Sequence, residues 1–344
     1  MTAMRRWAAL ALAAVLCGVG VEARTATTTP RELVTQLRIA AAMGVYKEAS
    51  GISKALTGHG EDALPAIGEG INSGDRMVTI YLLGSLGGIG GDESTSLLVS
   101  CLNEEDLDLS AKAASRLDNR PIRRPLTGGE LAALVALVRD KSGTMAGRAA
   151  RVLGNCREVP AEQRAAPILV RFIVEIPRVQ PGDEAPLERY SYVSPRVFRL
   201  NKFLLAFSYI GTGAISVVSD ARQERAADPE MHKWLTLALG MAGDAEVAGE
   251  LEQIVRGETD TSTRIEAIRA YARSAGEAAI PLLVSLLDDA TVTGPTDCAR
   301  TGNPDLDKQY PIRMVAADEL TDLGRNDLVL SHRRSTGSQA ATTK

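Results

Sequence analysis

One stretch of 30 residues limits the possible folds of this chain more than any other. Segment 260–289, DTSTRIEAIRAYARSAGEAAIPLLVSLLDD, has apolar residues three and four positions apart in two successive blocks. Gly276 separates the blocks, and Pro281 lies in the first turn of the second block, where a helix tolerates a missing N–H. The segment therefore predicts two short amphipathic helices. Such a pair cannot bury its apolar faces alone and needs neighbours on both sides.

The rest of the chain repeats this pattern with a nearly constant period. Gly211, Gly243 and Gly276 follow one another at intervals of 32 and 33 residues, and Pro65 and Pro167 stand in sequence contexts like that of the proline above. Helix pairs with a period of about 30–35 residues predict an α-solenoid. The predicted helices are 47–58 and 63–72, 76–89 and 93–103, 107–118 and 129–140, 144–154 and 162–175, 199–210 and 213–226, 230–242 and 245–256, the two helices of 260–289, and 311–323.

Four phrases carry a resemblance to a known repeat family. RAARVLGN (148–155), TRIEAIRAYARSAG (263–276), AIPLLVSLLDD (279–289) and YPIRMVAADELTDLG (310–324) resemble HEAT repeats, and most of all the short bacterial HEAT-like units related to phycobilin-lyase repeats. The resemblance covers residues 45–325. It implies an all-α fold, an armadillo-like superhelix of about seven antiparallel helix pairs. It also implies an inter-repeat polar ladder, in which Arg148, Arg264 and Arg313 match the ladder position early in the first helix of a pair.

The N-terminus predicts export. Arg5 and Arg6 precede the apolar run 7–21, and the small-residue site Val-Glu-Ala follows at 21–23. This order is typical of a signal peptide, here 1–23, which would send the protein to the periplasm or outside the cell. The apolar run is shorter than the about 20 residues of a membrane-spanning helix, so we expect no stable membrane span after cleavage. An uncleaved anchor is the alternative.

The repeats occupy only part of the remaining chain. We expect an N-terminal lead-in at 24–44, the repeat region at 45–330 and a disordered tail at 331–344. Two insertions without helical periodicity, 176–195 and 291–310, interrupt the repeat region, and each follows the second helix of a pair. Loops of this length are uncommon unless they are functional or disordered.

The sequence lacks the short motifs of common enzymes and cofactor sites. It contains no His-Glu dipeptide, as found in HEAT-like di-iron hydroxylases, and no G-x-S-x-G nucleophile motif. The Gly-rich segment 82–91, LLGSLGGIGG, lacks the Lys-Ser/Thr of a phosphate-binding loop and predicts close helix contact instead. We therefore expect no catalytic residues and no cofactor.

Metal ions and nucleic acids are also poor candidates as ligands. Asn303, Asp305 and Asp307 could offer oxygen atoms to Ca²⁺, but the remaining residues of a calcium loop are missing, so a solvated polar loop is favoured. Cys101 and Cys156 are expected to be small buried residues rather than metal ligands. The net charge is −4 and no run of Lys or Arg exists, so we expect no metal site and no nucleic-acid partner.

A protein partner is the remaining expectation. The two insertions hold Tyr190, Tyr192 and Tyr310, three of only seven Tyr residues, and Tyr is frequent at binding hot spots. Neutral insertion drift is the alternative. The leading hypothesis is an exported, non-enzymatic scaffold or adaptor that binds a protein partner through its repeat surface. The alternative is an accessory protein of an enzyme system, or a lyase-like HEAT-repeat protein that acts on a cofactor-bearing protein.

Overall fold

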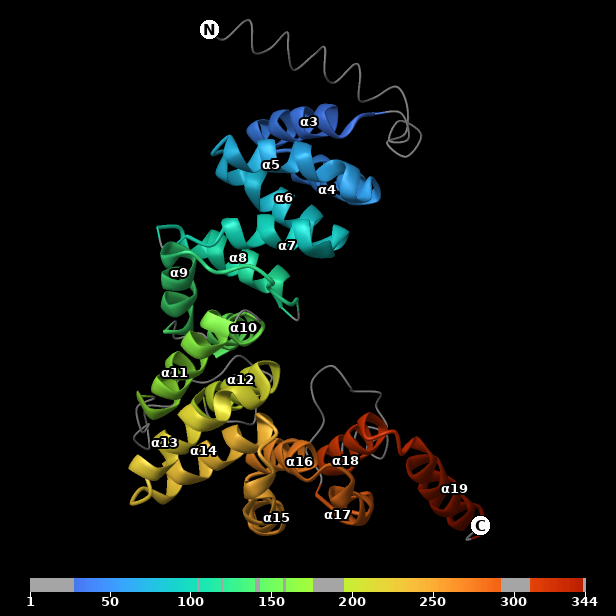
Figure 1. The fold of residues 1–344 in the computed structure, drawn as a ribbon. Coiled ribbons are helices and arrows are strands. Elements are labelled where there is room, and N and C mark those ends of the chain that lie inside the picture. The colour runs from blue at the N-terminus through green and yellow to red at the C-terminus, as the bar shows by residue number, and fades with distance from the viewer. Residues whose placement is uncertain are drawn as a thin grey trace, which may run out of the picture. The chain divides into compact units, whose positions relative to one another are not determined.

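A computed structural model describes residues 28–103, 105–118, 120–139, 143–156, 159–175, 195–291 and 310–342 (Figure 1). These residues form helices and no strand, so the predicted all-α class is confirmed for them. The chain divides into two compact units, an N-terminal unit that ends at Leu117 and a C-terminal unit that begins at Asp118. The expected signal peptide and most of both insertions, 176–194 and 292–309, lie outside the described residues.

The described part of the N-terminal unit contains six α-helices. They are α3 (Pro30–Met43), α4 (Tyr46–Gly58), α5 (Leu64–Asn72), α6 (Arg76–Ile89), α7 (Gly91–Ser100) and α8 (Leu107–Leu117). The first helix of each pair, here called an A helix, packs against the next one: α4 against α6 and α6 against α8. Leu56, Leu82 and Leu86 are fully buried in this core. The predicted helix 76–89 coincides with α6.

Helix α3 lies within the segment that was expected to be a lead-in. Thr29 accepts a hydrogen bond from the backbone N–H of Glu32, and the Glu32 carboxylate accepts one from the N–H of Thr29, which forms a capping box. Leu33 and Leu37 are buried, and α3 packs against α4 and α5. Helical spacing of apolar residues thus extends about one helix further towards the N-terminus than the repeat pattern indicated.

The C-terminal unit continues the alternation of helices. It contains α9 (Gly128–Val138), α10 (Gly143–Gly154), α11 (Val159–Glu175), α12 (Pro195–Ile210), α13 (Ile215–Glu224), α14 (Pro229–Met241), α15 (Ala248–Gly257), α16 (Thr261–Ala275), α17 (Ile280–Leu286), α18 (Pro311–Asp322) and α19 (Asn326–Thr342). Its A helices pack in sequence, α10 against α12, α12 against α14, α14 against α16 and α16 against α18. Each predicted helix of this region has a counterpart within a few residues.

The same turn joins the two helices of several pairs. Gly60, Gly211 and Gly276 have positive φ angles of 59°, 68° and 56°, and each begins a short 3₁₀ turn that leads into the second helix. Only glycine adopts this backbone conformation without steric cost. Pro281 then lies in the first turn of α17, as predicted. Pro167 differs, because α11 begins at Val159 and the proline therefore lies inside the helix.

Helix α19 covers most of the C-terminal segment, and the expected disorder of the tail stays a prediction. Helix α19 extends to Thr342, whereas 331–344 was expected to be a disordered tail. The expectation rested on the lack of large apolar residues, which argues against burial but not against a helix. Val329 is buried and attaches the start of α19 to the unit, and Gln and Ala in its later turns have high helix propensity.

One described stretch, Phe203–Glu224, is long and apolar enough to cross a membrane by length and composition. It comprises the end of α12, the 3₁₀ turn Gly211–Ala214 and α13, so a positive-φ glycine divides it. Of its most apolar window, 39% is buried in the fold. The core helices of soluble proteins meet the same criterion, and this stretch is weak evidence for a span.

Candidate functional site

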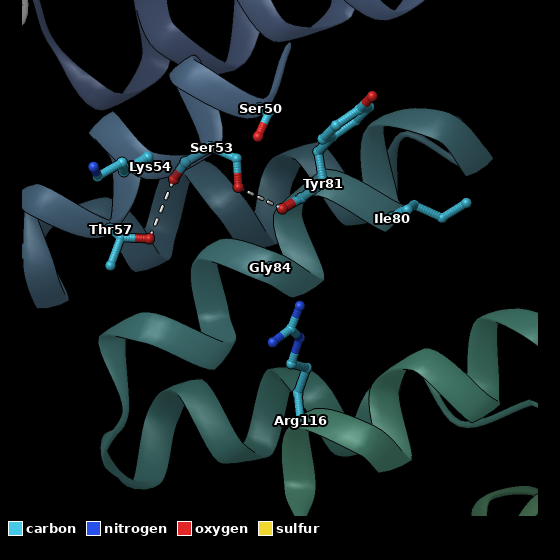
Figure 2. A pocket seen from close by; sticks show the side chains of 8 residues that line it. All are labelled: Ser50, Ser53, Lys54, Thr57, Ile80, Tyr81, Gly84 and Arg116. Atoms are coloured by element: carbon cyan, nitrogen blue, oxygen red, sulfur yellow. Dashed lines mark hydrogen bonds between the residues drawn. The ribbon is translucent and has the colours of Figure 1, made fainter. Parts of the chain in front are cut away.

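A shallow polar pocket lies on the A helices of the N-terminal unit (Figure 2). It offers about 350 Å³ of open space, and side chains from three successive A helices line it. The lining residues are Ser50, Ser53, Lys54 and Thr57 of α4, Ile80, Tyr81 and Gly84 of α6, and Arg116 of α8. None of these residues is acidic, and none is a histidine.

Glycines of α6 make room for the pocket. A Cβ atom on Gly87 would lie 2.7 Å from Cδ of Arg116, and one on Gly88 would lie 2.5 Å from Cγ2 of Thr57. Side chains from α8 and α4 therefore extend over α6 at positions where any other residue would displace them. The interpretation of LLGSLGGIGG as a close helix contact is confirmed at these two glycines.

The hydroxyl groups between α4 and α6 connect the two helices. Ser53 Oγ donates a hydrogen bond to the carbonyl oxygen of Tyr81 at 2.8 Å, and Ser85 Oγ donates one to the carbonyl oxygen of Ser53 at 2.9 Å. Thr57 Oγ1 also donates to the Ser53 carbonyl, at 3.2 Å. Because these hydroxyl protons are used within the protein, the hydroxyls fix the pocket wall more than they serve a ligand.

The two cations of the pocket have no ion-pair partner in the described part of the chain. Lys54 and Arg116 are exposed, and no carboxylate lies within ion-pair distance of either among those residues. Arg76 of the same unit differs, since its guanidinium contacts Asp106 at 2.7 Å and Asp108 at 2.6 Å. Arg76 holds the pKa of the Asp106 carboxyl group below its usual range, and Lys112 together with Arg76 does the same for Asp108. The pocket thus keeps two positive charges available to solvent.

Two of the three expected ladder arginines converge on one aspartate. Arg264 of α16 forms an ion pair with the Asp289 carboxylate at 2.9 Å and donates from Nε to the carbonyl oxygen of Val255 at 2.8 Å. Arg313 of α18 donates from Nε to the carbonyl oxygen of Asp289 at 2.6 Å. Asp289 therefore joins successive A helices of the C-terminal unit, a role that the sequence analysis did not assign to it.

The third arginine, Arg148, has no ion pair among the residues that the structure describes. Arg151, one turn later in α10, pairs instead with Asp118 across 33 positions of sequence. Both side chains are largely buried. The ladder role of Arg148 stays a prediction, and the contact between Arg151 and Asp118 was not predicted, although the two are opposite charges about one repeat apart in the sequence.

The three tyrosines are not brought together by the described structure. Tyr310 precedes α18, and the guanidinium of Arg313 lies over its ring, 4.2 Å from the centroid. Tyr190 and Tyr192 lie outside the described residues, as do Asn303, Asp305 and Asp307. The expected binding residues therefore remain a prediction.

Cysteines and acidic residues do not form a metal site in the described ranges. No group of three or more His, Cys, Asp or Glu side chains is close enough there to hold an ion. Cys101 and Cys156 are buried free thiols, and burial raises the pKa of Cys101 to about 11. A thiol that stays protonated is a poor metal ligand and a poor nucleophile, which agrees with its interpretation as a small core residue.

Buried charge gathers where α16 and α18 pack together. Glu319 of α18 is buried, and burial raises the pKa of its carboxyl group to about 7, against the opposing attraction of Arg273 and Arg269. Glu266 of α16, also buried, accepts a hydrogen bond from Arg269 at 2.8 Å. These buried carboxyl groups belong to the interface between α16 and α18 and do not line the pocket.

The chain matches no protein-family model, and no curated protein matches it in sequence. Any function must therefore be argued from the helices and side chains themselves.

Proposed function

We propose that this protein is an exported, non-enzymatic scaffold that binds a protein partner through the surface of a HEAT-like α-solenoid. The observation that carries the proposal is the pocket on α4, α6 and α8, an open polar site that three successive A helices build together. Sites of this kind, spread over neighbouring repeats, suit recognition of an extended partner.

The packing order of the helices supports the solenoid. In both units each A helix contacts the next A helix along the chain, as in α4–α6–α8 and α12–α14–α16. Glycine turns with positive φ recur between the helices of a pair, at Gly60, Gly211 and Gly276. A chain of helix pairs in contact mainly with their neighbours is the pattern that defines a solenoid.

The chemistry of the pocket favours binding over catalysis. Its lining contains neither a carboxylate nor an imidazole, the groups that most often transfer protons in enzymes. Ser53, one of the lining hydroxyls, already donates its proton to the Tyr81 carbonyl. The lining therefore offers positive charge and hydrogen-bond donors but no nucleophile paired with a base.

Photo-crosslinking of the full chain in its native envelope tests the partner. A photoreactive residue in place of Ser50, which lines the pocket, should give a discrete crosslinked protein, identified by mass spectrometry. The same residue in place of Gln253, exposed on α15 of the C-terminal unit, is the matched control. A product that forms equally at both positions, or at neither, contradicts the proposal. A cofactor-bearing product would instead favour the accessory or lyase-like alternative.

Export requires its own measurement. The Val-Glu-Ala site at 21–23 predicts a mature chain that begins at Arg24. N-terminal sequencing of the protein from the envelope fraction should find this residue first. Retention of Trp7 in that fraction would show an uncleaved anchor, and recovery of the full chain only from the cytosol would contradict export.

A further inference from the structure

We propose that the pocket on α4, α6 and α8 binds a carboxylate-rich segment of the partner, with Arg116 and Lys54 as the two anion contacts. The inference rests on the proposed function, because it names the chemistry by which a protein partner is recognised. Two cations from different helices and a lining without acidic residues together define a site that selects negative charge.

The position of Arg116 depends on the glycines beneath it. Figure 2 shows its guanidinium directed toward Gly84, across the surface of α6. Cγ, Cδ and Nε of Arg116 all lie within 3.3 Å of the point that a Cβ on Gly87 would occupy. Gly87 thus allows the arginine to lie flat on α6 and carry its charge into the pocket instead of extending into solvent.

Lys54 supplies the second charge from α4. It lies on α4, four residues after Ser50 and one turn before Gly58, whereas Arg116 comes from α8. An arginine fork binds a carboxylate with two parallel hydrogen bonds, and a lysine offers a compact charge that adapts to a second one. A segment with acidic side chains can therefore satisfy both cations at once.

Carboxylates fit this site better than a single phosphate does. Phosphate sites in proteins commonly use free backbone N–H groups at a helix N-terminus or in a glycine loop. Gly84 and Gly87 lie inside α6, where backbone N–H groups are bonded to the preceding turn. Ser53 and Thr57 donate to carbonyl oxygens. The charged donors of the lining are two separate side-chain cations, each suited to its own carboxylate.

The size and openness of the pocket agree with a peptide segment. Its 350 Å³ lies near the lower end of the about 300–1,000 Å³ found for ligand pockets. It opens to solvent, so it would leave much of a small ligand uncovered. An extended segment that crosses α4 and α8 would instead place acidic side chains in the pocket and its backbone outside. Tyr81 at the rim offers an aromatic contact to such a segment.

Fluorescence anisotropy with a defined probe tests the inference. The probe is a short fluorescein-labelled peptide of alternating Glu and Ala, titrated with the full chain at low and at high salt. R116Q and K54Q should each raise the dissociation constant by about tenfold, because each removes one charge-assisted contact. Binding by the parent protein should weaken as salt rises.

Matched variants separate the site from general charge attraction. R38Q on α3 and K47Q on α4 remove the same charge from exposed positions of the same unit that do not line the pocket. Both should bind the probe like the parent. Gly87→Ala keeps every charge but displaces Arg116, so it should weaken binding, whereas Gly58→Ala, with no atom near its Cβ, should not.

The outcomes distinguish this inference from the proposed function. Equal losses in the pocket and control variants would overturn it, as would no loss in R116Q and K54Q. Inorganic phosphate that displaces the peptide at lower concentration than acetate does would also overturn the carboxylate assignment. Peptide binding without any crosslinked partner would leave the site in place and remove the scaffold. A partner captured equally by R116Q and the parent would support the scaffold and overturn the anion site.

Discussion

Helices α6 and α10 are both A helices with glycine contacts and an Arg–Asp pair, yet they use these features in opposite ways. A Cβ on Gly87 of α6 would meet the flexible end of a side chain, whereas one on Gly154 of α10 would overlap the backbone carbonyl of Ala206 in α12. Arg76 of α6 is 49% exposed in its ion pair, whereas Arg151 of α10 is only 12% exposed. The same residue types build an open surface in the N-terminal unit and a packed interface in the C-terminal one.

The largest expected effect concerns the packed glycine. Gly154→Ala should lower the free energy of unfolding of the C-terminal unit by about 3 kcal/mol, because backbone atoms of α10 and α12 must separate. Urea denaturation of the full chain should show the loss. Hydrogen exchange should place it in α10 and α12 rather than in α6. Unchanged stability would show that the close approach of these helices is not needed.

A buried carboxyl group should give the C-terminal unit an unusual pH dependence. The pKa of Glu319 in the folded state is about 7, above its ordinary value of 4.5, so the protonated form favours folding. Stability should be fully present below about pH 4.5 and decline as the pH rises through 7. Glu319→Gln should remove this decline and add roughly 2–3 kcal/mol at about pH 8.

The control for Glu319 is Glu246→Gln, which alters an exposed carboxyl group of the same unit and should leave the pH profile unchanged. Asp106 of the N-terminal unit offers the contrast. Arg76 lowers its pKa below 3.8, so its contribution to stability is present at neutral pH and is lost as the pH falls through the lowered value. Hydrogen exchange measured as a function of pH should therefore differ between the two units. The same pH dependence in both units would contradict these opposite effects of Glu319 and Asp106.

Loss of the buried Arg–Asp pair should lower stability more than loss of the exposed one. Arg151→Gln leaves the carboxylate of Asp118 largely buried without its partner, which should cost about 1–3 kcal/mol. Arg76→Gln leaves Asp106 and Asp108 accessible to water, and the loss should be smaller. Both losses are measured by urea denaturation, with salt added to screen the exposed pair. An equal cost for the two variants would show that burial does not separate them.

The smallest expected effect concerns the glycine under Arg116. Gly87→Ala should change stability by no more than about 1 kcal/mol, because alanine favours the helix while the arginine side chain moves aside. Thermal melting of the variant beside Gly154→Ala gives the direct comparison. A loss as large as that of Gly154→Ala would mean that α6 and α8 are packed as rigidly as α10 and α12.

The sequence predicted the helices well because apolar spacing is a local signal. The predicted helix 76–89 matches α6, and 311–323 matches α18 within one residue. Helix α3 was missed although its capping box, Thr29 to Glu32, is visible in the sequence. Helix α3 precedes residue 45, where the resemblance to the repeats begins, so the repeat pattern does not predict it.

The pocket could not be predicted from the same pattern. Lys54 and Arg116 lie on the polar faces of their helices, where apolar periodicity carries no information. Only the packing of α4, α6 and α8 brings them to one site. The ion pair between Arg151 and Asp118 could not be predicted for a related reason. Arg148 and Arg151 both fit an amphipathic helix, and the rotation of α10 about its axis decides which one reaches Asp118.

The recurring glycine turns bear on how such a chain can change length over generations. At Gly60, Gly211 and Gly276 a positive φ and a 3₁₀ turn fix the step from the first helix of a pair to the second. An added residue there would alter the geometry of the pair itself. In the described residues the connection from α5 to α6 contains no 3₁₀ turn, and both sequence insertions, 176–195 and 291–310, fall between one pair and the next. Evolution can therefore duplicate whole pairs or lengthen the joints between them, while the turn within each pair stays under selection.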